Sequence, residues 1–190
     1  MDFVIWESAA PVGAVGLDSI ENVERARLLG RGVSMREGFS PQAQFRVSKR
    51  PKSTTFVDDL SNLDSVKVCS ARLVAFLQRQ RLAHLEYLPV RILDQRGRLA
   101  TEDYRIVNPC PAQAVLDLER SGPRFSAMRK TTIVELKKFV IDTGRLDRTF
   151  RVFRVQEFPS PVLIDRERAE AMSEEGFVGP DFVELEDYES

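Results

Sequence analysis

The sequence has few of the residues on which catalytic and metal sites depend. It contains one histidine, His84, and two cysteines, Cys69 and Cys110, which stand 41 positions apart. A histidine without a surrounding motif does not support Ser-His-Asp or Cys-His catalysis, and two distant cysteines do not form a zinc-binding pattern. The glycines have neither the spacing of a phosphate loop nor that of a dinucleotide fingerprint. We therefore expect no enzyme activity, no metal and no cofactor.

Long apolar runs are also absent. No stretch approaches the ~20 apolar residues that a membrane-spanning helix requires, and the first residues are too few and too acidic for a signal peptide. Two cysteines fit a reducing compartment better than a disulfide scaffold. The 190 residues are 43% hydrophobic and 30% charged, which is ordinary for a soluble globular protein. We expect a cytoplasmic protein without membrane contact.

Charge is distributed unevenly along the chain. Residues 169–190 contain eight acids and no base, so removing this −8 from the net charge of −1 leaves +7 on the rest. Such asymmetry indicates a surface for a basic partner, acids neutralised by the chain's own arginines, or a solvated terminus. The candidate partner-binding residues are seven acids of this segment and one earlier acidic pair: Glu170, Glu174, Glu175, Asp181, Glu184, Glu186, Asp187, Asp58 and Asp59.

Two segments share the order strand, helix, strand. Ser70 and Asp165 each end an apolar run and stand where an N-cap side chain would accept hydrogen bonds from the first turn of a helix. The helices are expected at residues 71–80 and 166–175. The flanking apolar runs, expected to be strands, are Val66–Cys69 and Leu85–Leu93 in the first segment, and Val162–Ile164 and Phe182–Leu185 in the second.

Two hairpins are expected between these segments. The first joins Leu85–Leu93 to a return strand around Tyr104–Asn108 through a turn at Asp94–Gly97. The second pairs Thr131–Val140 with Thr149–Val155. Apolar spacing in Thr131–Val140 also fits a helix, but its β-branched start favours a strand.

The first part of the chain is less regular. We expect a strand at Asp2–Trp6, a helix at Asp18–Leu29 and a brief strand at Gln44–Val47. Residues 1–55 are thus predicted to be an irregular N-terminal region and residues 56–190 an α+β domain, together one globular unit. The fold class is α+β, with an antiparallel or mixed sheet built from hairpins and two main helices packed on it.

One basic segment suggests nucleic-acid binding. Arg145, Arg148, Arg151 and Arg154 alternate with Phe150 and Phe153, and aromatic residues framed by arginine can stack single-stranded bases. The two phenylalanines are expected on opposite faces of a strand, so that only one could stack outward. In the other reading, one phenylalanine lies in the core and the arginines pair with the acidic end.

A more specific indication comes from Tyr104-Arg105-Ile106-Val107-Asn108, followed by Asp117 and Ser121. This pattern resembles the MXAN-type immunity family of bacterial polymorphic-toxin systems, long catalogued as a domain of unknown function. The capped second helix followed by Gly176-Phe177-Val178-Gly179-Pro180-Asp181-Phe182 is also similar to that family. The resemblance covers about Val66 to Leu185, although Asp165 replaces the more usual hydroxyl cap.

The resemblance implies a cytoplasmic antidote that binds a cognate toxin encoded nearby and blocks it without catalysis. It carries no catalytic residues across. An acidic surface would steer association with a basic toxin, and the nucleic-acid-binding module through Arg145–Arg154 is the alternative function. Tyr104, Asn108, Asp117 and Ser121 are expected to fix hydrogen bonds of the hairpin and of the sheet corner. The sequence leaves the oligomeric state open.

Overall fold

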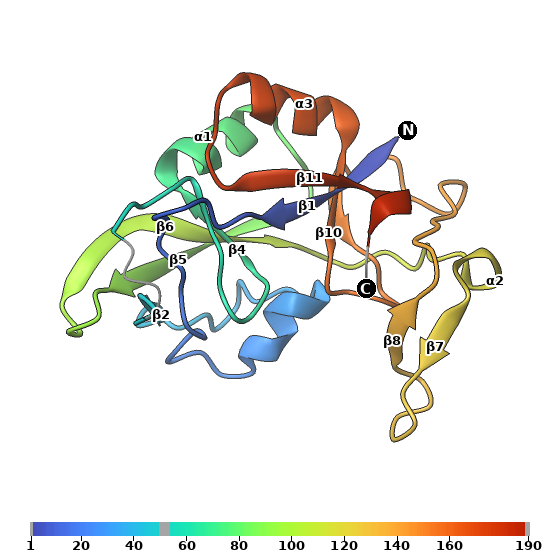
Figure 1. Ribbon diagram of the computed structural model, residues 1–190, viewed down its shortest axis with the longest axis horizontal. Helices are drawn as coiled ribbons and strands as arrows, with labels where there is room; N and C mark the ends of the chain where they lie inside the picture. The colour runs from blue at the N-terminus through green and yellow to red at the C-terminus, as the bar shows by residue number, and fades with distance from the viewer. Residues whose placement is uncertain (1, 50–53, 189–190) are drawn as a thin grey trace.

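The computed structural model describes residues 2–49 and 54–188, in which three sheets are formed (Figure 1). Their strand orders are β11-β1-β10-β9, β2-β5-β6-β4-β3 and β7-β8. The strands are β1 Phe3–Ser8, β2 Gln44–Arg46, β3 Asp59–Leu60, β4 Lys67–Ser70, β5 Leu85–Leu93, β6 Leu99–Pro109, β7 Pro123–Phe125, β8 Ile133–Leu136, β9 Val152–Arg154, β10 Val162–Asp165 and β11 Pro180–Glu184. The helices are η1 Ala26–Arg31, α1 Ala71–Arg79, α2 Leu118–Ser121, α3 Arg166–Glu174 and η2 Leu185–Asp187, of which η1 and η2 are 3-10 helices.

The predicted α+β class is confirmed. The strand pairs are antiparallel except for β2 and β5, which run parallel, so the five-stranded sheet is mixed. In the four-stranded sheet β1 lies between β10 and β11, so the beginning and the end of the chain share one sheet. The division at residue 55 stays a prediction.

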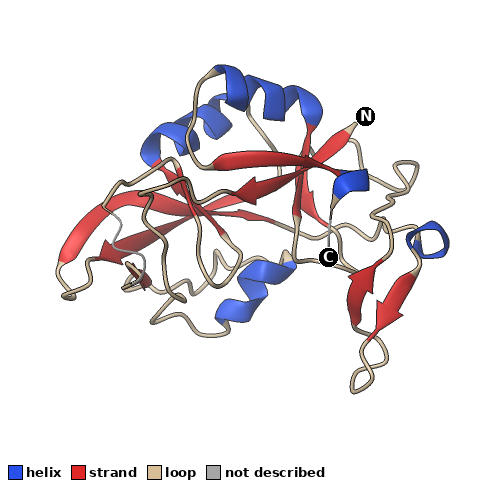
Figure 2. Cartoon of the chain, in the orientation of Figure 1, coloured by secondary structure: helices blue, strands red, loops and turns tan. Residues whose placement is uncertain are grey.

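The two capped segments form as predicted. Ser70 Oγ accepts a hydrogen bond from Leu73 N at 3.2 Å, and Asp165 Oδ1 accepts one from Arg168 N at 3.1 Å. We call β4–α1 the first capped unit and β10–α3 the second. Both helices cover the same side of the molecule (Figure 2), and their buried side chains share one core cluster with residues of β1, β4 and β10.

Two further core clusters lie beside this one. Residues between Ala14 and Val57 pack with apolar side chains of the five-stranded sheet, including Leu88, Val90 and Ile106. The other cluster joins the four-stranded sheet to the segment that contains α2, β7 and β8. The molecule therefore has three adjoining clusters rather than one central core.

The first predicted hairpin is confirmed as β5 and β6, and two of its motif residues tie it to segments that precede β3. The Tyr104 hydroxyl donates to Val57 O at 2.7 Å. Asn108 Nδ2 donates to Glu86 Oε2 at 2.9 Å and to Val33 O at 3.0 Å. These bonds agree with the structural role expected for both residues.

The second predicted hairpin is wrong. Strand β8 falls within Thr131–Val140, but it pairs with β7, and β9 pairs with β10. The short β7 follows directly after α2 and offers β8 a nearer partner than β9. Residues 142–147 form irregular turns rather than a hairpin loop.

The helix expected at Asp18–Leu29 is largely absent. Only its end enters η1, whereas Leu17 and Glu21 form isolated bridges with Val47 and Gln44. Asp18 Oδ1 accepts from Ser48 Oγ at 2.6 Å instead of capping a helix. The loosely spaced apolar residues of this stretch therefore pack against the five-stranded sheet instead of forming a helix.

Candidate functional site

The nine acids predicted to bind a partner lie in three different environments. The first is the protein interior, which contains Asp59. Asp59 is fully buried, and its Oδ2 accepts from Trp6 Nε1 at 2.9 Å and Ser8 Oγ at 2.8 Å, with Lys67 Nζ 3.8 Å away. Burial raises the pKa of Asp59 and lowers the pKa of Lys67. Asp59 therefore contributes to the interior, and its carboxylate does not reach the surface.

The turn before β11 is packed directly against Asp59. Gly179 has φ +108°, and a Cβ at this position would lie 2.3 Å from Asp59 O. Only glycine fits such an approach. The Ala9 amide also donates to Gly179 O at 2.7 Å. The segment from Gly176 to Phe182, which resembles the immunity family, thus holds β11 against the five-stranded sheet.

Two acids are engaged in contacts between elements. Asp58 accepts from Ser70 Oγ at 2.7 Å and from Arg72 Nη1 at 3.0 Å, which joins the start of α1 to the residue that precedes β3. Glu184 accepts from Arg166 Nη1 and Nη2 at 2.8 and 2.6 Å, and Arg166 also pairs with Asp2. These hydrogen bonds lower the pKa of Glu184 and the pKa of Asp2. They tie α3 to β11 and to the beginning of β1.

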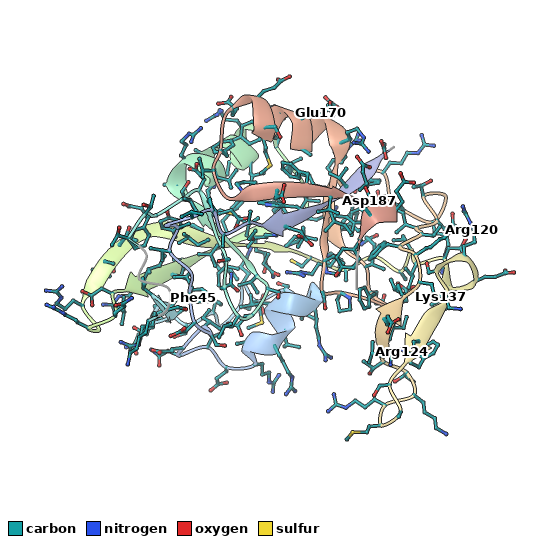
Figure 3. All side chains as sticks on the ribbon, in the orientation of Figure 1. Phe45, Arg120, Arg124, Lys137, Glu170 and Asp187 are labelled. Carbon is teal, nitrogen blue, oxygen red and sulfur yellow. The ribbon has the colours of Figure 1, made fainter. Side chains whose placement is uncertain are left out.

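The other six acids have exposed side chains and form no ion pair within the described part of the chain. We call them the acidic surface; they are Glu170, Glu174, Glu175, Asp181, Glu186 and Asp187. They lie on or beside α3, β11 and η2, and Figure 3 shows Glu170 on α3 and Asp187 on η2. Glu189, which belongs to the same acidic segment, lies outside the described residues.

The end of α3 places acids where they are electrostatically unfavourable. The helix ends at Glu174 with Glu175 as its C-cap, and its last turn contains no base. The carbonyl end of a helix carries partial negative charge and favours cations. Arg72 from α1 donates to Glu175 O at 2.6 Å, but the carboxylates of Glu174 and Glu175 have no ion pair among the residues that the structure describes. A positively charged partner would therefore be attracted to this end of α3.

The basic segment with two phenylalanines does not form a stacking surface. Phe150 and Phe153 are both buried, and the strand β9 begins only at Val152, so the predicted alternation does not apply to Phe150. Arg154 is 1% exposed and donates to three backbone carbonyls, at Pro159, Ser160 and Ser65. Burial lowers the pKa of Arg154 to about 10. These residues contribute to the core.

His84 stacks on Phe150 with ring centroids 3.8 Å apart, and its Nε2 lies 3.1 Å from Thr149 Oγ1. It does not line the cavity of about 240 Å³ whose walls include Trp6, Lys67 and Tyr188. Among residues 2–49 and 54–188, no three histidine, cysteine or acidic side chains are placed to share a metal ion. His84 therefore does not share a catalytic site with the ionisable residues of this cavity.

The described helices are all too short or too polar to cross a bilayer. No curated protein matches the sequence. The chain does match the immunity protein family Imm11 over residues 7–187, which extends the likeness from Val66 back into the N-terminal region. Because this match covers nearly all 190 residues, the chain belongs to the Imm11 immunity protein family.

Proposed function

We propose that this protein is a cytoplasmic antidote that binds a cognate bacterial toxin, encoded nearby, and neutralises it by surface complementarity without catalysis. Its membership of an immunity protein family supports this role. The observation that carries the proposed mode of binding is the acidic surface, whose six exposed carboxylates have no ion pair within the described residues. A basic toxin surface would be attracted over a distance, which accelerates association.

The contacts within the protein narrow the set of residues assigned to this interface. Asp59 is buried, and Asp58 and Glu184 are bound to arginines of the same chain. Binding a toxin through these three would require existing contacts to break. The acidic surface needs no such rearrangement, and Glu174 and Glu175 at the end of α3 would gain most from an opposing cation.

The test uses the purified full-length protein and the toxin domain encoded beside it. Stopped-flow fluorescence at low and high salt should show association that slows as salt rises. The variant Glu186→Lys/Asp187→Lys should associate about tenfold more slowly at low salt, because steering charges mainly change association rates. It should also depend less on salt than the unmodified protein.

A matched control is available in the N-terminal region. Glu24 and Glu37 are exposed and have no ion pair within the described residues, so Glu24→Lys/Glu37→Lys changes the net charge equally. Equal association rates for the two double variants would exclude the proposed surface. Failure of the unmodified protein to form a complex or to protect cells from the toxin would exclude the antidote function itself.

A further inference from the structure

A projecting hairpin carries the charge opposite to that of the acidic surface. Strands β7 and β8 stand apart from the two larger sheets (Figure 1). Residues 120–138, which we call the basic hairpin, contain six bases and one acid and so have a net charge of +5 in a chain of net charge −1. Figure 3 shows Arg120, Arg124 and Lys137 in this region, away from Glu170. The positive charge of the hairpin is thus separated from the acids of α3.

Most of the cations in the basic hairpin are not used within the chain. The one acid, Glu135, is paired across the strands with Arg124, whose Nε donates to it at 2.8 Å. Arg120 Nη1 lies 3.9 Å from Asp117 Oδ2. The other four, Arg129, Lys130, Lys137 and Lys138, are exposed and form no ion pair within the described part of the chain.

Apolar side chains are exposed between these cations. Met128, in the turn between the strands, is 93% exposed, and Phe125 and Val134 are 44% and 41% exposed. Exposed apolar groups rimmed by charges are typical of protein interaction sites. Methionine in particular adapts its shape to a partner's pocket. The turn of the hairpin therefore places the exposed Met128 beside the cations Arg129 and Lys130.

The base of the hairpin is held in place by two residues of the sequence motif. Asp117 caps α2 by accepting from Arg120 N at 3.0 Å. Ser121 is fully buried, and its Oγ both donates to Val140 O and accepts from Val140 N, each at 3.2 Å. Ser121 O also accepts from Lys137 N at 3.0 Å. These bonds clamp the chain before β7 to the chain after β8.

The strands and their turn are fixed as well. Ile133 and Leu136 are buried in the core cluster that also contains Phe139. In the turn, Ser126 N donates to Thr132 O and Thr132 N donates to Arg129 O, both at 2.8 Å. A projecting element with one conformation loses little entropy when it binds. The basic hairpin is thus prepared for insertion rather than left to fold on contact.

We propose that the basic hairpin is a second docking element, which enters a concave acidic surface of the cognate toxin. This inference rests on the proposed antidote function. Met128 would occupy an apolar pocket in that concave surface, while Arg129 and Lys130 contact carboxylates around it. The acidic surface and the basic hairpin would then contact different parts of the same toxin.

The surroundings of the hairpin favour a protein over a nucleic acid. Tyr188 packs on Phe139 with ring centroids 5.7 Å apart, which places η2, with Glu186 and Asp187, near the base of the hairpin. A polyanion long enough to contact all the hairpin cations would meet these acids. Met128 would gain little from a phosphate backbone, whereas an apolar pocket on a protein would bury it.

The experiment measures the affinity of the full-length protein for the purified toxin domain by titration calorimetry. Arg129→Glu/Lys130→Glu should weaken binding about 100-fold, and Met128→Ser about tenfold, since a few central residues dominate most interfaces. Arg27→Glu/Arg31→Glu, which alters two exposed arginines of η1 equally, should bind within about twofold of the unmodified protein. All substituted side chains are exposed, and thermal melting checks that each variant is folded.

The possible outcomes separate the two proposals. If the unmodified protein does not bind the toxin, the antidote function fails. If it binds, and Arg129→Glu/Lys130→Glu binds as tightly as the η1 control, the hairpin inference fails while the antidote function stands. Retardation of a labelled 30-nucleotide strand that this variant abolishes would assign the hairpin to nucleic acid. A concentration-dependent dimer that it abolishes would assign the hairpin to a second copy, and either result would overturn the inference.

Discussion

The two capped units are built alike but differ in the burial of their helices and in the charge at the helix ends. In both, a strand leads through an N-cap side chain into a helix of nine residues. Helix α1 buries four apolar side chains and ends with Arg79, a favourable charge for its position, whereas α3 buries two and ends with Glu174. Surfaces that bind partners often retain such unfavourable features. Helix α1 thus packs mainly into the core, whereas the exposed face of α3 belongs to the surface that we propose for binding.

The link between the units is expected to be the most sensitive point. Gly179 follows the second unit and packs on Asp59, whose strand pairs with the first. Gly179→Ala places a Cβ against backbone at 2.3 Å and should lower the free energy of unfolding by about 3 kcal/mol or more, or prevent folding. Gly176→Ala, at φ +67° with open space around it, should cost about 1 kcal/mol. Urea denaturation measures both, and equal losses would show that the close approach is absent in solution.

The attachment of α3 should depend on pH. Arg166 lowers the pKa of both Asp2 and Glu184, so the stability from these pairs is present above the ordinary carboxyl pKa and lost as pH falls through the lowered values. Arg166→Gln should therefore flatten the decline of the melting temperature as pH falls below about 4.5. Arg27→Gln, an exposed arginine in η1, should keep the steep decline. Parallel profiles for the two variants would contradict this account.

The smallest expected effect sharpens the contrast between the helix ends. Glu174→Gln removes an unfavourable charge and should stabilise the isolated protein by about 0.3 kcal/mol, whereas Arg79→Gln at the end of α1 should destabilise it by a similar amount. Thermal melting at low salt measures these changes. Glu174→Gln should at the same time slow toxin association. If Glu174→Gln raised the stability without slowing association, the negative charge at the end of α3 would not contribute to toxin binding.

Local chemistry made much of the fold predictable. Ser70 and Asp165 were placed correctly because an N-cap depends on only a few neighbouring residues, and the β5–β6 hairpin because its turn is short. The partner of β8 was predicted wrongly because strand pairing depends on distant segments. The position of β1 between β10 and β11 could not be predicted either, since no local pattern specifies it.

Only the negative charge of the candidate site could be predicted from the sequence. The acidic segment is evident in the sequence, but the burial of Asp59 and the pairing of Glu184 with Arg166 depend on contacts that only the fold establishes. The basic hairpin was missed, although six bases against one acid in residues 120–138 gave a visible signal. The interleaved phenylalanines of Arg145–Arg154 predicted a stacking surface there instead, but in the structure both are buried.

The central place of β1 also has a consequence for biosynthesis. When a ribosome has translated residues 1–160, neither hydrogen-bonding neighbour of β1 has yet been made, because both come from residues 162–184. Strand β1 then remains without its partners until β10 and β11 have been translated. Pairing of strands that are far apart in the sequence is slow. Under the proposed antidote function, protection of the cell would begin only after β11 has been translated, and shorter translation products would provide none.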